Sequence, residues 1–184
     1  MGKIVILSGS PSKQSRLLHL IGYSKESLER HGADVEVLHI GDLPSEDLIS
    51  ANFDGKRIRS AVQKVVSADA LVIATPVYKA SYTGVLKTFL DLLPQKGLEN
   101  LAAFPLFIGG SIAHLLAVDY ALKPVLSALG IRLIAQGVYA VDTQIVRNGD
   151  GTAVIEADLR KRLDLALDDF IRIANHHRLI SVTE

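Results

Sequence analysis

The sequence predicts an α/β fold in which a five-stranded parallel sheet lies between two layers of helices. Three observations lead to this fold class. Short β-branched runs alternate with longer helical stretches, so that strands and helices follow one another along the whole chain. The runs 3–7 and 70–74 are apolar almost throughout, which is typical of strands buried on both faces. Right-handed crossovers leave few topologies, among which we expect the strand order 2-1-3-4-5.

Local signals set the bounds of each element. The first helix begins at Ser15 and ends near Gly32, because glycine suits the position that follows a helix, and Pro94 ends the third helix. Residues 41–55 form a loop with at most one turn of helix, and residues 147–151 form a polar turn. The expected strands are 3–7, 34–40, 70–74, 104–108 and 132–140. The expected helices are 15–30, 56–67, 85–93, 113–129 and 155–174.

The composition fits one domain, residues 1–184, with a sizeable core, since 48% of the residues are hydrophobic and no repeat or linker divides the chain. Basic and acidic residues both number 20, so no bulk charge attracts nucleic acid or an anionic membrane. No apolar run reaches the roughly 18 residues that a membrane helix needs, and the N-terminus lacks the features of a signal peptide. We expect a cytoplasmic protein that binds neither nucleic acid nor membrane.

Cysteine is absent, which excludes disulfides, thiolate nucleophiles and cysteine metal sites. Redox chemistry would therefore have to be carried by a bound cofactor. The adjacent His176 and His177 point about 100° apart on a helix, so we expect no metal site there. Met1 is the only methionine. This low content of sulfur-containing residues fits either random drift or a protein that is made when sulfur is scarce.

The first segment that carries chemistry is the first loop, residues 8–16, between the first strand and the first helix. Ligands of open parallel sheets bind beyond the carboxyl ends of the strands. Small hydroxyl residues and Gly9 let the backbone wrap round an anion at a helix N-terminus, and Arg16 could add a charged contact. The loop is neither a GxGxxG nor a Walker A motif, which favours a monophosphate. The alternative is an ordinary serine-rich turn with Ser15 as the N-cap.

The second loop, residues 75–87, and the third loop, residues 109–114, follow the next two central strands. Backbone amides of the second loop can reach the polar edge of a flat heterocycle while its Val and Tyr side chains cover the ring. The glycine pair of the third loop permits close approach to a ligand. The alternatives are a loop whose two tyrosines simply pack and a plain tight turn. We interpret His114 as a surface or hydrogen-bonding residue rather than a general base.

Several stretches together resemble one family. The sequence is similar to the NADPH-dependent FMN reductases of alkanesulfonate use from the first strand to about residue 145. The resemblance is carried by residues 9–11, 74–79, 84–94 and, most specifically, 114–129. It implies a flavodoxin-like three-layer sandwich and hydride transfer from NADPH to FMN. It also implies a homo-tetramer or dimer, and delivery of reduced flavin to a monooxygenase that cleaves sulfonates.

The resemblance also implies site residues. By position, the FMN phosphate would be held by Ser10, Ser15 and Arg16. The flavin ring would be surrounded by Pro76, Val77, Tyr78, Lys79, Ser81, Gly109, Gly110 and Ser111. The wider family usually has Arg where Ser12 stands and often Asn where Leu17 stands, so Lys13 or Arg16 would supply the charge here.

Tyr120 is the position that the resemblance singles out, as an inserted residue that bulges its helix into a π turn at a tetramer interface near the flavin and governs flavin exchange. The sequence adds an independent reason for irregularity. Pro124 has no amide hydrogen, so the carbonyl four residues earlier loses its helical partner, and such breaks occur as kinks or π-bulges. The alternative is a Pro-kinked helix with a packed tyrosine.

Three rival functions remain on the same fold. A reductase of quinones, azo dyes or metals would keep its FMN tightly bound. A flavodoxin-type electron carrier would not be an enzyme, and such chains are usually strongly acidic, whereas this one is neutral. The third rival is a regulatory flavin-binding module. Hydride transfer itself needs no acid or base from the protein, so no catalytic side chain is predicted.

Overall fold

The computed structural model describes residues 2–181 and contains the expected parallel sheet. The strand order is β2-β1-β3-β4-β5, and β6 also pairs with β4, so the predicted order is confirmed. All these pairings are parallel. The strands are β1 (Lys3–Ser8), β2 (Asp34–His39), β3 (Ala70–Pro76), β4 (Ala102–Gly109), β5 (Leu133–Ile134) and β6 (Val138–Val141).

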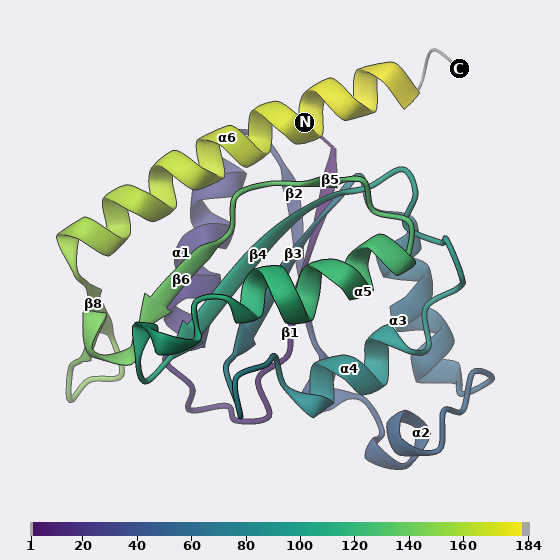
Figure 1. Ribbon diagram of the computed structural model, residues 1–184, viewed down its shortest axis with the longest axis horizontal. Helices are drawn as coiled ribbons and strands as arrows, with labels where there is room; N and C mark the ends of the chain where they lie inside the picture. Colours follow the sequence, from purple (N-terminus) through teal and green to yellow (C-terminus); the bar gives the residue numbers. More distant parts are fainter. Residues whose placement is uncertain (1, 182–184) are drawn as a thin grey trace.

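Helices cover both faces of the sheet (Figure 1). The alternation of side chains along β1 divides the core, because Ile4 and Ile6 pack on one face while Val5 and Leu7 pack on the other. The first face is covered by α1 (Leu17–Arg30) and α6 (Ala157–Ser181). The second face is covered by α3 (Lys56–Val66), α4 (Gly84–Leu90) and α5 (Lys123–Ala128), and the short α2 (Ser45–Ile49) lies close to α4.

The last strand is broken, so the continuous strand predicted over 132–140 is wrong. Ala103 pairs with Ile134, whereas Leu106 pairs with Val138, so the register shifts by one residue between β5 and β6. Such an extra residue in one strand is a β-bulge. Pro105 lies opposite the break and has no amide to donate. A Cβ on Gly137 would lie 2.7 Å from the Pro105 Cβ, so the residue facing this proline has no side chain.

The helix predicted over 113–129 consists of three kinds of helix in succession, and the π turn predicted around Tyr120 is confirmed. A 3-10 turn, η2 (Ile112–His114), leads into a π-helix, η3 (Val118–Leu122), and then into α5. The amide of Tyr120 donates to the carbonyl four residues earlier, at 2.9 Å. The amide of Lys123 instead reaches back five residues, to Val118. Pro124 follows at once without an amide, so the ladder breaks where the sequence indicated.

Residues 145–155 form an antiparallel hairpin of β7 (Ile145–Arg147) and β8 (Ala153–Ile155), where the sequence predicted only a polar turn at 147–151. The last helix consequently begins at Ala157 rather than 155, and it extends to Ser181 rather than 174. The first helix begins at Leu17, two residues later than expected. Gly32 has φ +81, as its place after α1 requires. Two further 3-10 turns, η1 (Ile40–Asp42) and η4 (Asp142–Gln144), follow β2 and β6.

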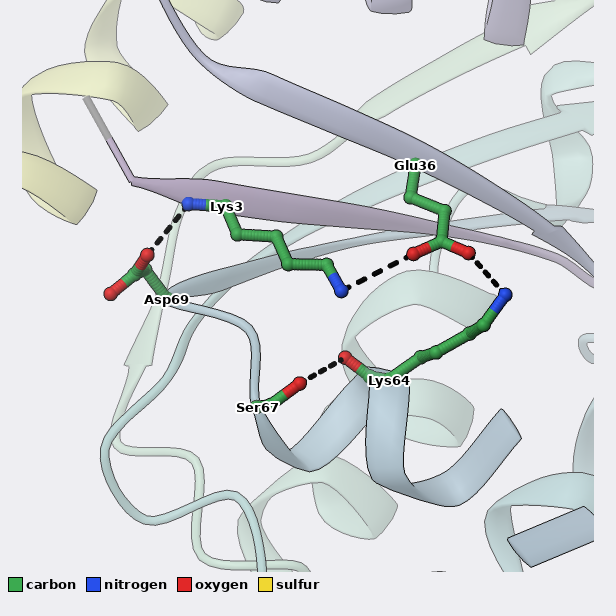
Figure 2. A network of polar contacts seen from close by, with 5 residues as sticks. All are labelled: Lys3, Glu36, Lys64, Ser67 and Asp69. Atoms are coloured by element: carbon green, nitrogen blue, oxygen red, sulfur yellow. Dashed lines mark hydrogen bonds and ion pairs between the residues drawn. The ribbon is translucent and has the colours of Figure 1, made fainter. Parts of the chain in front are cut away.

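Charged residues join the strands at the amino ends of β1 and β3 (Figure 2). The Glu36 carboxylate lies between two ammonium groups, that of Lys3 at 3.2 Å and that of Lys64. The pKa of Glu36 is lowered, chiefly by the hydrogen bond from Lys64. Asp69 accepts the backbone amide of Lys3 at 2.6 Å. These contacts connect β1, β2, α3 and the start of β3.

Candidate functional site

Hydrogen bonds tie the three loops to one another at the carboxyl edge of the sheet. The Gly9 amide donates to the Ala74 carbonyl at 2.8 Å, and the Val77 amide donates to the Ile108 carbonyl at 2.8 Å. The hydroxyl of Thr83, which is buried, donates to the Gly9 carbonyl at 2.6 Å. The first loop is therefore fixed to the second, and the second to the strand that carries the third.

The first loop organises itself with its own hydroxyls and leaves amides free. The Ser10 hydroxyl donates to the Ser12 carbonyl at 2.9 Å, and the Ser15 hydroxyl accepts the Leu17 amide at 3.2 Å. Within residues 2–181, the backbone amides of Ser10, Lys13 and Arg16 have no hydrogen-bond partner. Three unpaired amides beside a helix N-terminus suit an anion such as a phosphate.

The two cations expected to compensate for Ser12 each contact a residue outside the first loop. The Arg16 Nε donates to the Ile145 carbonyl at 3.1 Å, which joins the start of α1 to the β7–β8 hairpin. The Lys13 ammonium lies 2.9 Å from the Asp42 carboxylate, and it holds the pKa of that carboxyl below its usual range. The terminal amino groups of Arg16 have no partner among the described residues, so they remain available to a ligand.

The second loop contains a two-residue turn in an unusual backbone conformation. Tyr78 and Ser81 exchange backbone hydrogen bonds at 2.9 and 3.2 Å. Between them, Lys79 and Ala80 have φ values of +50 and +62. Both central residues of a type I′ turn require positive φ, a position that usually takes Asn or Gly. Strain of this kind is concentrated at functional sites. The turn leaves the amides of Lys79, Ala80 and Tyr82 unpaired within residues 2–181 and exposes the Tyr78 ring.

The third loop is fixed to the sheet by a hydrogen bond from a residue of β6. The hydroxyl of Tyr139 donates to the Ser111 carbonyl at 2.7 Å. Burial, together with the negative charge of Asp142, raises the pKa of Tyr139, so the phenol stays protonated and remains a donor. Beyond Gly109, the Gly110 backbone lies in open space, with the Asp142 carboxylate as the nearest group to a Cβ built there, at 4.0 Å. The Ser111 hydroxyl accepts the Ala113 amide and so caps η2.

An exposed apolar strip follows the third loop. It consists of Ile112, Leu115, Leu116 and Tyr120, and the Tyr120 side chain is 77% exposed. A packed tyrosine, the alternative interpretation of this helix, is therefore wrong. His114 is exposed on the same segment.

Two cavities flank the first loop. One of about 260 Å³ lies between Ser10–Lys13 and the end of β2, at His39. The other, of about 300 Å³, lies between the start of α1 and the hairpin, and its lining includes His19 and Arg147. The hairpin was missed as a neighbour of the site. The short β-branched apolar runs on both sides of the 148–151 turn, 145–146 and 153–155, could have revealed it.

The residues present fit a flavin mononucleotide. The first loop offers unpaired amides and hydroxyls for a phosphate. The second and third loops offer unpaired amides for the polar edge of a ring, with Val77 and Tyr78 as apolar cover. Among residues 2–181, no group of three or more His, Asp or Glu could hold a metal ion. Likewise, no described helix is both long and apolar enough to cross a membrane.

The strand order and the three loops at its carboxyl edge define a flavodoxin-like α/β protein. Residues 2–145 match the family model described as NADPH-dependent FMN reductase, and the chain belongs to that family. It is an oxidoreductase of the NAD(P)H-dependent FMN reductase class, with FMN and NADPH as its cofactors.

The chain is similar to proteins from two bacteria that are named FMN reductase (NADPH). The Escherichia coli (strain K12) protein is 44% identical over 99% of this chain and 94% of its own length. The Pseudomonas putida protein is 45% identical over 91% of this chain and 85% of its own length. A crystal structure of NADH:FMN oxidoreductase (EMOB) in its apo form superposes with a TM-score of 0.82, at 39% identity, over 92% of this chain and 88% of that one.

Proposed function

We propose that this protein reduces FMN with NADPH in the cytoplasm and releases the reduced flavin to a partner monooxygenase that cleaves sulfonates. The observation that carries the proposal is the set of three connected loops, in which one group of unpaired amides suits a phosphate and two suit a ring. When bound, FMN supplies the hydride-accepting chemistry. The chain's own residues bind the flavin, orient it and cover it against water.

Each loop takes one part of this task. Ser10, Ser15 and Arg16 contact the phosphate, together with the unpaired amides of the first loop. The ring lies between the second loop, with Pro76 to Lys79 and Ser81, and the third loop, with Gly109, Gly110 and Ser111. Both loops are fixed to the sheet, so the flavin is held in one orientation relative to the nicotinamide.

The apolar strip around Tyr120 is proposed as the contact with further copies of the chain, which would give a homo-tetramer or dimer. Four large apolar side chains exposed together on one helical segment support this, because contiguous apolar patches mark interaction sites. The π-helix begins four residues after the third loop, at Val118. A change in its packing would therefore reach the flavin site, which supports a role for Tyr120 in flavin exchange.

The sulfonate partner is supported by two features of the sequence. The segment 114–129 resembles the reductases of alkanesulfonate use, and the chain contains a single methionine and no cysteine. A protein made when sulfur is scarce is expected to contain little of it.

The proposal is tested by following NADPH oxidation spectrophotometrically with and without added FMN. Turnover that depends on free FMN and saturates with it is the expected result. A second measurement adds a purified flavin-dependent sulfonate monooxygenase and an alkanesulfonate, and sulfite release should then require this protein. FMN that stays bound through gel filtration, together with quinone turnover, would instead establish a reductase with a resident flavin.

A further inference from the structure

Tyr139 belongs to none of the three loops, yet it contacts the third loop through the only polar atom of its side chain, the hydroxyl oxygen. It lies on β6 beside Phe107 of β4, and its side chain is buried in the core. Its hydroxyl reaches past the end of β4 to the Ser111 carbonyl, at 2.7 Å. A buried phenol usually finds a partner for its hydroxyl. Here that partner is the backbone of the third loop.

Gly109 makes room for this contact. A Cβ at Gly109 would lie 2.1 Å from the Tyr139 hydroxyl oxygen and 3.0 Å from the adjacent ring carbon, Cζ. Any other residue would therefore displace the phenol. At Gly110, by contrast, a Cβ would meet nothing closer than 4.0 Å. The two glycines thus have different structural roles. Gly109 makes room for the Tyr139 hydroxyl, and Gly110 leaves the surface of the loop open.

The hydrogen bond to the Ser111 carbonyl also fixes the direction of the neighbouring amide. The carbonyl shares a planar trans peptide with the Ile112 amide, so fixing the direction of the carbonyl fixes the opposite direction for the N–H. Ile112 is the first residue of η2, and its amide has no partner among residues 2–181. The carbonyl points toward buried Tyr139. The Ile112 N–H is consequently turned toward the exposed side of the third loop.

We propose that Tyr139 is a positioning residue for the flavin, which sets the third loop, and the Ile112 amide in particular, in the orientation that binds the ring. This inference rests on the FMN site proposed above. Without the hydroxyl, the loop keeps its sequence and its glycines but loses the contact that fixes the plane of the peptide between Ser111 and Ile112. Flavin binding would then have to include the ordering of the loop.

The test compares Tyr139→Phe with the parent by quenching of flavin fluorescence and by thermal unfolding. We expect the Kd for FMN to rise about tenfold, the effect of one lost hydrogen bond. The KM for FMN should rise to match, with kcat unchanged at saturating FMN. The matched control is Tyr23→Phe, because the Tyr23 hydroxyl also donates one hydrogen bond, to Asp164 at 2.6 Å, between α1 and α6. This control should change the Tm but not the Kd.

A second pair of variants separates positioning from stability. Gly109→Ala in the parent should weaken FMN binding, because the new methyl displaces the hydroxyl. In the Tyr139→Phe background the same substitution should have a smaller effect, since the atom that it meets most closely is gone. Additive effects, or an unchanged Kd for Tyr139→Phe beside a parent that binds FMN, overturn the inference. A parent that binds no FMN overturns the proposed function, and the inference with it.

Discussion

Thr83 gives the sharpest test of how the first two loops are held together. Its hydroxyl donates to the Gly9 carbonyl at 2.6 Å and accepts the Leu86 amide at 3.2 Å as the N-cap of α4. Thr83→Val keeps the shape and removes both bonds. Loss of the cap costs about 1 kcal/mol, and a buried carbonyl left unpaired costs about 1–2 kcal/mol. The free energy of unfolding should therefore fall by roughly 2–3 kcal/mol.

For a chain of this size, each kcal/mol lowers the Tm by about 2–4 °C, so we expect a drop of roughly 4–12 °C. Urea unfolding gives the free energy directly, and an FMN titration of the same variant should show weaker binding. The control is Thr88→Val on the same helix, where only a bond to the Val85 carbonyl at 2.9 Å is lost. A Thr83→Val variant as stable as the Thr88→Val control would refute the reasoning.

Three further outcomes are expected. Arg16→Ala should weaken FMN binding through loss of a charge-assisted contact and loosen the hairpin at Ile145, and unchanged FMN affinity in a fluorescence titration would count against the assignment. Tyr120→Ala should shift the protein toward smaller assemblies in analytical ultracentrifugation, retain flavin more tightly and lose reduction of free FMN, whereas parent-like assembly and turnover would exclude its special role. The lowered pKa of Glu36 means that its ion pairs stabilise the fold above the ordinary Glu pKa of 4.5 and that this contribution is lost as the pH falls through the lowered value. Glu36→Gln should therefore flatten the acid side of a plot of urea midpoint against pH, and an unchanged acid slope would show that these ion pairs do not stabilise the fold.

The strand segments and the three loops could be predicted from the sequence because they depend on local patterns, and the strand order was chosen among the few topologies that right-handed crossovers leave. Apolar runs and the residues after them determine which segments enter the sheet and which segments meet at its edge. The irregular helix could be predicted too, since Pro124 removes an amide wherever it lies. The strand segments, the loops and the break in the helix require no knowledge of distant partners.

The remainder depended on tertiary contacts. The break between β5 and β6 arises because Pro105 lies opposite it. The register between two strands depends on both of them, so it cannot be predicted from the sequence of one strand. Lys79 and Ala80 adopt positive φ without a glycine, so the usual sequence signal for that turn is missing. Arg16 was expected at a phosphate, but its Nε also meets a carbonyl 129 residues away in the sequence.

The interrupted last strand has a consequence for aggregation. A sheet edge with a continuous row of unpaired amides and carbonyls invites a strand from another molecule. Here the outer edge consists of two residues of β5 and four of β6, with a bulge between them. The longest regular run on this edge is therefore the four residues of β6, whereas β2 at the opposite edge keeps six. Pro105 thus shortens the run on this edge that a strand of another molecule could extend.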